Sequence, residues 1–219
     1  MFGSISGRYD LLNRVLSGGW DRSWRRRAVA AVAEAAPARV IDIGTGTADL
    51  ALDLLRVSGF RGSVVGVDFA GPMLVRAAGK SLGQPRVHLA QCDALALPFR
   101  DAAFDAAMAA FSVRNFADLD RGLFECRRVI RRGGTLVILE FFRPERLPFP
   151  LRLYSRWFVP AIGRVVSGHA TAYSYLPDSQ ESFVSIASAT ETLLRNGFAV
   201  RRVDRLFPGV AHLLVLDRL

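Results

Sequence analysis

The stretch Val40–Asp68, VIDIGTGTADLALDLLRVSGFRGSVVGVD, decides the fold of this chain. Its first apolar run ends at two glycines, Gly44 and Gly46; a helical pattern follows, and a second apolar run ends on Asp68. This order predicts a strand, a glycine turn at the N-terminus of a helix, and a second strand. Because doubly wound α/β sheets bind an adenosyl ligand with this unit, we expect an adenosine site at the turn.

The same alternation of strand and helix patterns continues on both sides of this unit. Apolar runs predict strands at 39–43, 63–68, 86–91 and 104–110, and helical patterns lie at 20–35, 47–57, 72–81, 118–130 and 179–195. A turn at Gly133-Gly134 leads into TLVILEFF, which is typical of a strand covered on both faces. The last extended runs, FAVRRVDRLF and VAHLLVL, predict an antiparallel pair joined at Pro208-Gly209. The order predicts an α/β fold with a Rossmann-like, seven-stranded, mostly parallel sheet whose last strand is antiparallel.

The length of 219 residues and the apolar content of 51% suit a single domain over residues 1–219, because no Pro/Ser-rich linker divides the chain. Within this domain we expect an N-terminal helical lid at about 1–36. We also expect an insertion at about 143–178, where prolines interrupt an aromatic and arginine-rich stretch.

The net charge of +9 comes almost wholly from arginine, since Lys80 is the only lysine. A basic balance favours an anionic partner such as nucleic acid or an acidic membrane surface, although genome composition can produce the same bias.

Cys92 and Cys126 form no CxxC pair, which favours a reduced, cytoplasmic setting. The N-terminus has no signal-peptide core, and no apolar run reaches the roughly 20 residues of a membrane span. We therefore expect a soluble protein that is at most peripheral at the inner face of the cell membrane. The oligomeric state stays open, with a homo-oligomer among the options.

Two cofactors suit an acid at the end of the second strand: a nicotinamide dinucleotide and S-adenosylmethionine. A dinucleotide fingerprint needs a glycine three residues after Gly46, where this chain has Asp49, whose charge would repel a pyrophosphate. S-adenosylmethionine carries a cationic sulfonium, for which Asp42 and Asp49 are suitable neighbours. The sequence thus favours S-adenosylmethionine and a class I methyltransferase, with cofactor-binding residues at Asp42, Gly44, Gly46 and Asp68.

A further acid, Asp93, follows the third apolar run at the same edge of the predicted sheet. Its carboxylate is placed to accept a hydrogen bond from the adenine amino group while the Ala94 amide meets the ring. An ordinary turn or cap residue is the alternative for an isolated Asp. Beside the acids and glycines already assigned, we prefer the adenine role.

Four further segments of the chain carry a resemblance to a known family. They are RYDLLNRVLSGGWDRSWRRRAV, DALALPFRDAAFD, FSVRNFADLDRGLFECRRVIRRGGTLVILEF and YLPDSQESF. Together they make nearly the whole chain resemble the quinone C-methyltransferases, the demethylmenaquinone and 2-polyprenyl-methoxy-benzoquinol methyltransferases of menaquinone and ubiquinone synthesis. The resemblance implies a polyprenyl quinol substrate and cofactor contacts at Thr47, Asp68, Asp93 and Ala94. The segment RNF favours demethylmenaquinol, with the benzoquinol as the alternative.

The chain departs from that family's pattern at three positions. Ala110 stands where the ubiquinone branch has a serine contact with the cofactor, so this contact is absent or shifted to Ser112. Ala48 replaces the usual glycine after the loop threonine, and His169 replaces an acid that often follows Ser-Gly.

Methyl transfer to a ring carbon requires that the adjacent hydroxyl lose its proton or that the phenolate be stabilised. Arg114 and Asn115 follow the fourth strand, at the edge where the methyl group should lie. Because the pKa of an arginine side chain is above about 12, we expect Arg114 to stabilise the phenolate or orient a water, with Asn115 as a hydrogen-bonding partner. The alternative pairs Arg114 with Asp118 or Asp120. Tyr9 is expected to fold over the ring as part of the lid, unless the N-terminal helix simply packs on the sheet.

The insertion interleaves apolar side chains with arginines. This pattern predicts a cap over the core, an apolar entrance for a polyprenyl tail whose arginines contact anionic lipid headgroups, or both. His169 is its only histidine, and for it a solvated loop position competes with a role as base. His88 and His212 lie in strand patterns. No two histidines have metal-ligand spacing, so no metal is predicted.

Two other functions compete with quinol methylation. An RNA methyltransferase would suit the sequence pI of about 10.8, but the chain lacks an Asn/Asp-Pro-Pro-aromatic segment and an RNA-binding module, so nucleic acid is not an expected partner. A non-catalytic adenosyl-binding scaffold is the other alternative.

Overall fold

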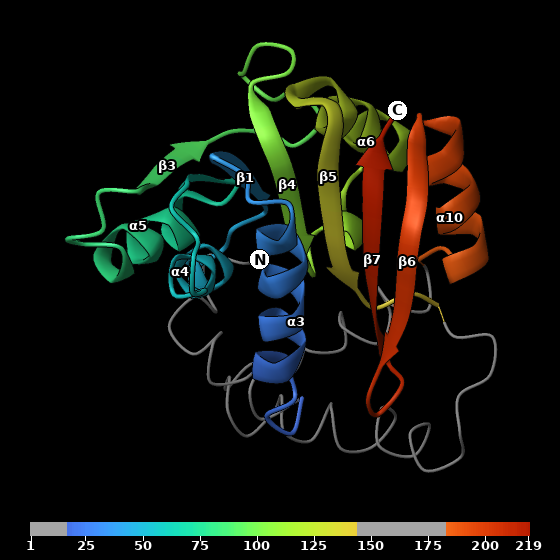
Figure 1. Cartoon of the computed structure of the whole chain (residues 1–219), viewed down its shortest axis with the longest axis horizontal. Helices are drawn as coiled ribbons and strands as arrows, with labels where there is room; N and C mark the ends of the chain where they lie inside the picture. Colours follow the sequence, from blue (N-terminus) through green and yellow to red (C-terminus); the bar gives the residue numbers. More distant parts are fainter. Residues whose placement is uncertain (1–16, 144–182) are drawn as a thin grey trace.

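The computed structural model describes residues 17–143 and 183–219, and a single mixed sheet forms the centre of this part (Figure 1). The strand order is β3-β2-β1-β4-β5-β7-β6. The strands are β1 (Arg39–Ile43), β2 (Ser63–Asp68), β3 (Val87–Gln91), β4 (Phe104–Ala110), β5 (Ile130–Glu140), β6 (Phe198–Leu206) and β7 (Ala211–Arg218). The helices are α3 (Asp21–Glu34), α4 (Asp49–Leu55), α5 (Gly71–Lys80), α6 (Leu119–Val129) and α10 (Ile186–Arg195), with a short 3-10 helix η1 (Val113–Asn115).

Strands β1 to β5 run parallel to their neighbours, whereas β7 is antiparallel to both β5 and β6. The order reverses at β1, because β2 and β3 extend the sheet to one side and β4 and β5 extend it to the other. The carboxyl ends of the parallel strands therefore meet at one edge. Ligands of open α/β sheets bind at such a reversal point.

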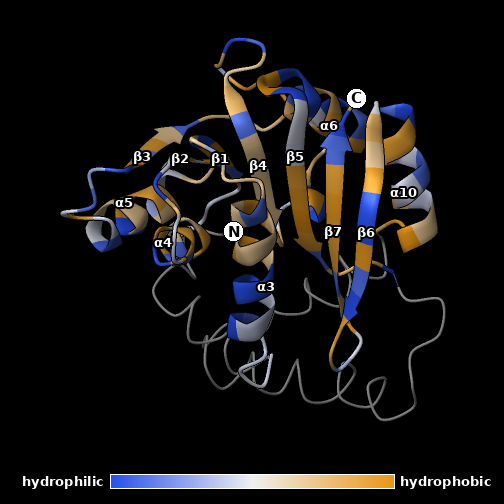
Figure 2. Ribbon diagram, in the orientation of Figure 1, coloured by the Kyte–Doolittle hydropathy of each residue, from blue (hydrophilic) through white to orange (hydrophobic). Residues whose placement is uncertain are grey.

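Alternate side chains of the central strands supply two apolar layers. In β4, Ala106 and Met108 belong to the layer covered by α3 and α4, whereas Ala107 and Ala109 belong to the layer covered by α6 and α10. Burial on both faces explains why these strands are nearly continuous apolar runs rather than alternating ones. Figure 2 shows the result as hydrophobic colouring along β4, β5 and β7. The predicted fold class is confirmed.

The bounds of β1, β2 and β4 agree with the sequence prediction to the residue, and β3 begins one residue later. The turn predicted at Gly133-Gly134 lies instead inside β5, where the pairing with β4 shifts register between Phe104 and Ala106. The φ of Gly133 is +67°, a left-handed conformation that suits glycine in a bulge. Helix α10 starts later than predicted, after the N-cap Ser185, whose side chain accepts a hydrogen bond from the Ser188 amide.

The described part of the predicted N-terminal lid is helix α3, which packs against the sheet. Trp24, Val29 and Val32 on this helix are buried in the core. Residues 1–16 and nearly all of the predicted insertion lie outside the described residues, as do the candidate residues Tyr9 and His169. None of the helices in residues 17–143 and 183–219 combines the length and hydropathy that a membrane span requires.

Candidate functional site

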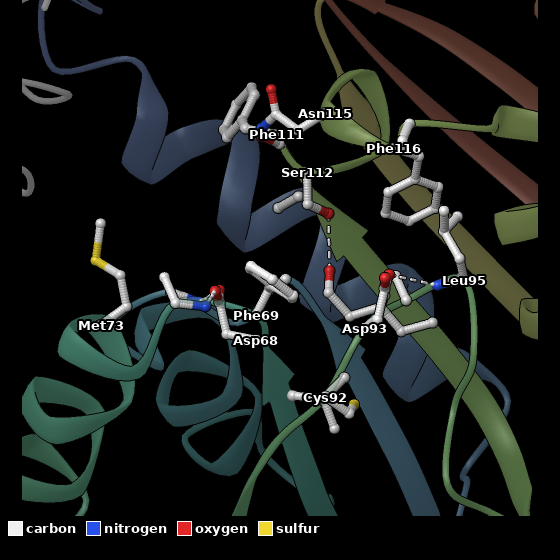
Figure 3. Close-up of a pocket in the computed structure, with 18 residues that line it drawn as sticks. Asp68, Phe69, Met73, Cys92, Asp93, Leu95, Phe111, Ser112, Asn115 and Phe116 are labelled. Carbon is white, nitrogen blue, oxygen red and sulfur yellow. Dashed lines mark hydrogen bonds between the residues drawn. The ribbon is translucent and has the colours of Figure 1, made fainter. Parts of the chain in front are cut away.

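A cavity of about 380 Å³ opens at the carboxyl edge of the parallel strands (Figure 3). Its wall consists of the segments that follow β1, β2, β3 and β4. The lining residues are Ile43, Gly44, Gly46, Val67, Asp68, Phe69, Ala70, Met73, Cys92, Asp93, Ala94, Leu95, Ala110, Phe111, Ser112, Asn115, Phe116 and Ala117. Of the predicted cofactor residues, five lie together in this wall: Gly44, Gly46, Asp68, Asp93 and Ala94.

The glycine turn after β1 is held tightly against the segment after β4. A Cβ on Gly44 would lie 2.3 Å from the Cβ of Ser112, and the φ of Gly44 is +73°. Only glycine satisfies both conditions without strain. The Ser112 hydroxyl donates to the Ile43 carbonyl at 2.7 Å, which joins the two segments behind the cavity. At Gly46 the space where a Cβ would point is open, so the backbone there is accessible to a ligand.

Asp68 lies at the end of β2 with both carboxylate oxygens bound by backbone amides. The Gly46 amide donates to Oδ2 and the Ala70 amide donates to Oδ1, each at 2.8 Å. These bonds fix the orientation of the carboxylate at the cavity wall, where its remaining lone pairs can accept from two vicinal hydroxyls. Phe69 follows at the rim and is 74% exposed, as expected for an apolar platform at a cavity mouth.

Asp93 lies on the loop after β3, opposite Asp68 across the cavity (Figure 3). Its Oδ1 accepts from the Leu95 amide at 2.9 Å, which closes a tight turn around Ala94. The neighbouring Cys92 also lines the wall, and burial, with Asp93 and Asp68 nearby, raises the pKa of its thiol to about 11. The Cys92 thiol is therefore un-ionised at neutral pH.

The sequence predicts Asp42 at the cofactor, but in the structure it lies behind the turn and does not line the cavity. Its side chain is buried, and the Thr45 hydroxyl donates to Oδ2 at 2.6 Å. Burial raises the pKa of Asp42 to about 7; the Thr45 hydrogen bond opposes this shift and the charge of Asp68 adds to it. The carboxyl of Asp42 therefore supports the glycine turn from the inside.

Thr47, the contact implied by the resemblance, and Asp49 are also absent from the cavity wall. Lys80 donates to the Thr47 hydroxyl at 2.8 Å and to Asp49 Oδ1 at 2.7 Å, and Arg25 lies 3.3 Å from Asp49. Asp49 thus has cationic partners of its own at the start of α4. The sequence favours a sulfonium beside Asp49, and in the structure Lys80 and Arg25 already balance this charge.

Arg114 and Asn115 occupy η1, but only Asn115 reaches the cavity wall. The Arg114 guanidinium is buried in an ion pair with Glu140 at the end of β5, and it also lies 5.6 Å from the centre of the Phe141 ring. The alternative that paired it with an aspartate of the next helix is wrong about the partner.

Sequence reasoning missed several apolar members of the wall: Phe69, Met73, Phe111 and Phe116. Phe111 is a non-glycine residue with a positive φ, +56°, and its ring stacks on that of Phe141 with centroids 4.6 Å apart. Phe69 and Phe111 each directly follow a strand, and this position was the signal that could have found them. No group of three metal-ligating side chains occurs in the part of the chain that the structure describes.

Known proteins are similar to this chain in sequence over most of its length. The profile of the ubiE/COQ5 methyltransferase family matches residues 1–215. A demethylmenaquinone methyltransferase from Thermus thermophilus is 47% identical over 221 residues, covering 100% of both chains. One of the same name from Deinococcus radiodurans is 44% identical and covers 100% of this chain and 91% of its own. A ubiquinone/menaquinone biosynthesis C-methyltransferase from Geotalea daltonii is 40% identical, covering 96% of this chain and 92% of its own.

Solved structures share the fold at lower identity. The [4+2]-cyclase SpnF has a TM-score of 0.72 and 18% identity, covering 100% of this chain and 93% of its own. A SAM-dependent methyltransferase from Aquifex aeolicus has a TM-score of 0.55 and 23% identity, covering 83% of this chain and 82% of its own. Because a cyclase shares the fold, the fold alone does not identify the reaction. The profile match across nearly the whole sequence does identify the lineage: the chain belongs to the ubiE/COQ5 methyltransferase family.

Proposed function

We propose that this protein transfers a methyl group from S-adenosylmethionine to a ring carbon of demethylmenaquinol, forming menaquinol. The proposal is supported by the Asp68 carboxylate, which backbone amides orient at the cavity wall. It is also supported by the similarity of the whole chain to proteins named demethylmenaquinone methyltransferase. The turn, the two acids and the cavity have the common architecture of adenosyl sites, and the relatives' names supply the acceptor.

The donor set around the cavity fits S-adenosylmethionine. Asp68 would accept from the two ribose hydroxyls, since its oxygens are held in place by backbone donors. Asp93 would accept from the adenine amino group beside the Ala94 amide, with Phe69 as an apolar contact for the ring. The open backbone at Gly46 would lie along the amino acid portion. When bound, the cofactor supplies the methyl group and a cationic centre.

The quinol side of the cavity is formed by the residues after β4. Asn115 lies in the wall, where its side-chain amide donates to the Phe111 carbonyl at 3.5 Å. An amide nitrogen carries two hydrogens, and one of them would be donated to a phenolate oxygen. Arg114 acts behind it: paired with Glu140, which also accepts from the Arg114 amide at 3.2 Å, it holds η1 in place. We keep Tyr9 as the residue that covers the ring from the N-terminal segment.

A second acceptor is the 2-polyprenyl-6-methoxy-1,4-benzoquinol of ubiquinone synthesis, because the Geotalea daltonii relative is named for both pathways. The test is methyl transfer from labelled S-adenosylmethionine to reduced short-tail demethylmenaquinone, to the matched benzoquinol and to tRNA. We expect transfer to the naphthoquinol and little to the others. Transfer to RNA and to neither quinol would overturn the proposal.

We also propose a transient contact with an anionic membrane surface, where a polyprenyl quinol resides. Trp20 and Phe207 are 42% and 65% exposed and touch each other, with ring centroids 4.6 Å apart. They lie at the start of α3 and in the turn between β6 and β7, toward the edge where β4 and β5 end (Figure 1). The exposed arginines Arg22 and Arg26 follow on α3 and suit anionic headgroups.

Vesicle co-sedimentation tests this contact. Wild type should bind vesicles containing anionic lipid better than neutral ones, and the variant Trp20→Ala/Phe207→Ala should lose much of that binding. The control is Leu82→Ala, a change at another exposed apolar residue, 85% exposed, that is expected to bind as wild type does. Equal binding of wild type to anionic and neutral vesicles would refute the contact.

A further inference from the structure

The loop between β3 and β4 carries Asp93, Ala94 and Leu95 into the cavity wall but contains no helix or strand of its own. Its first residue is tied to the end of β2, because the Cys92 amide donates to the Asp68 carbonyl at 3.1 Å. A loop without regular structure leaves backbone groups that need other partners.

Helix α6 provides those partners from one charged face. Arg121, Glu125 and Arg128 are spaced four and three residues apart, so they project from the same side of the helix. Glu125 is only 3% exposed, an unusual position for a carboxylate. Arg128 donates to both of its oxygens, at 2.9 and 2.7 Å. The hydrogen bonds from Arg128 lower the pKa of Glu125 against the opposing effect of burial, so the carboxylate stays ionised.

These three side chains bind the backbone of the loop at successive points. Glu125 accepts from the Leu97 amide at 2.8 Å, and Arg128 donates to the carbonyls of Leu97 at 2.8 Å and Phe99 at 2.6 Å. Arg128 also pairs with Asp101 at 2.9 Å. Closest to the cavity, Arg121 donates to the carbonyl of Leu95 at 3.0 Å, one residue after Ala94. We call Arg121, Glu125 and Arg128 the α6 clamp.

The same helix fixes a second part of the wall by close packing. A Cβ on Gly122 would lie 2.3 Å from Cδ2 of Phe116, which is itself a lining residue. Asp118 caps the helix by accepting from the Arg121 amide at 3.0 Å. The position of α6 therefore determines both the Phe116 side and the loop side of the cavity.

We infer that the α6 clamp is a positioning device for the cofactor, which sets the adenine selectivity of the site by holding Asp93 and Ala94 in register with Asp68. The inference rests on the proposed function, because it assumes that an adenosyl group occupies this wall. None of the three side chains lines the cavity, so they act through the loop backbone and do not touch the ligand. Their substitution should loosen the loop and lower the affinity for the adenosyl group.

The experiment compares the binding of S-adenosylhomocysteine and S-inosylhomocysteine by calorimetry. The second ligand carries a carbonyl where adenine has its amino group, so a correctly held Asp93 should reject it. For wild type we expect roughly 10- to 100-fold weaker binding of the inosyl ligand, as for loss of a hydrogen bond to a charged group. Glu125→Gln and Arg128→Met should bind S-adenosylhomocysteine roughly 10-fold more weakly and should discriminate less between the two ligands.

Arg128→Met leaves the Glu125 carboxylate buried without its main partner and so endangers the fold. Arg121→Met avoids this problem, because the Arg121 side chain is 51% exposed and its loss leaves no buried charge unpaired. The substitution still removes the hydrogen bond from Arg121 to the Leu95 carbonyl. The matched control is Arg131→Met, which removes an equally exposed arginine paired with Asp105 at 3.0 Å, away from the cavity. This control should bind both ligands as wild type does, and kinetics should show a higher KM for S-adenosylmethionine in the clamp variants alone.

The outcomes separate the inference from the proposed function. If wild type binds neither ligand, the proposed function is wrong. If it binds both ligands equally, Asp93 does not select adenine, and the selectivity assigned to the α6 clamp is refuted. If Arg121→Met and Glu125→Gln bind that ligand as tightly as wild type and discriminate equally well, the α6 clamp has no positioning role and the inference is overturned.

Discussion

Replacing Asp42 with asparagine should change how the stability of this protein depends on pH. The carboxyl is buried behind the glycine turn, and its pKa rises from an ordinary 3.8 to about 7, chiefly because of burial. A carboxyl whose pKa is raised by folding stabilises the native state fully below pH 3.8. That contribution is lost as the pH rises through about 7, because the native state must then either hold a buried charge or bind a proton.

The size of the effect follows from the two pKa values. Complete loss of the contribution corresponds to about 4 kcal/mol at 1.36 kcal/mol per pKa unit, of which about 2–3 kcal/mol falls between pH 5 and pH 8. The side-chain amide in Asp42→Asn is neutral at every pH and keeps an oxygen to accept from the Thr45 hydroxyl. The free energy of unfolding of wild type should therefore fall by about 2–3 kcal/mol more than that of Asp42→Asn over this range.

Urea denaturation of both proteins at pH 5, 6, 7 and 8 measures the difference, in which other titrating groups cancel. Asp105→Asn serves as a control of opposite sign. Partial burial acts to raise the pKa of Asp105, but hydrogen bonds from the Arg39 amide, the Arg131 side chain and the Ala38 amide lower it overall. Its stabilising contribution is present above the ordinary pKa and lost in acid, so this variant should lose stability at neutral pH. Parallel curves for wild type and Asp42→Asn would refute the reasoning.

Three further predictions concern the site and its support. Asp68→Ala should raise the Kd for S-adenosylhomocysteine roughly 100-fold, since two hydrogen bonds to a charged group are lost, and calorimetry showing an unchanged Kd would remove Asp68 from the site. Gly44→Ala should lower the free energy of unfolding by about 2–4 kcal/mol, because of the positive φ and the clash with Ser112, and Gly44→Ala/Ser112→Gly should recover part of this loss. Thermal unfolding of Gly44→Ala at the wild-type temperature would contradict the packing. Arg114→Met should lower the free energy of unfolding by about 3–5 kcal/mol, because the Glu140 carboxylate stays buried without its partner, and Arg114→Met/Glu140→Gln should recover part of this loss. Equal stability of the two variants in urea would argue against the ion pair.

The features that follow from backbone periodicity could be predicted from the sequence. The strand Arg39–Ile43, the turn glycines and the acid at the end of β2 all lie where their apolar patterns place them. The positions of Asp93 and Ala94 at the same edge follow from parallel strand order, since successive parallel strands end on one side of a sheet.

The side-chain partners could not be predicted, because they depend on which strands and helices become neighbours. Glu140 meets Arg114 only because β5 lies beside β4, and Lys80 meets Asp49 only because the end of α5 lies close to the start of α4. The motif places Asp42 beside the ligand, but it does not say whether the side chain points toward the cavity or into the core, where it is buried. A linear pattern gives the edge of the sheet but not the direction of each side chain.

The place of β7 in the sheet affects how the protein is made on the ribosome. This strand follows all the others in the chain, yet it lies between β5 and β6 and pairs with both. Until it has been synthesised, β5 presents a long apolar edge, and β6 has no partner to join. A nascent chain that has already formed β1 to β5 is thus exposed to edge-to-edge aggregation until the β7 residues leave the exit tunnel. Translation that stalls before Ala211 should release an aggregation-prone product rather than a partly active enzyme.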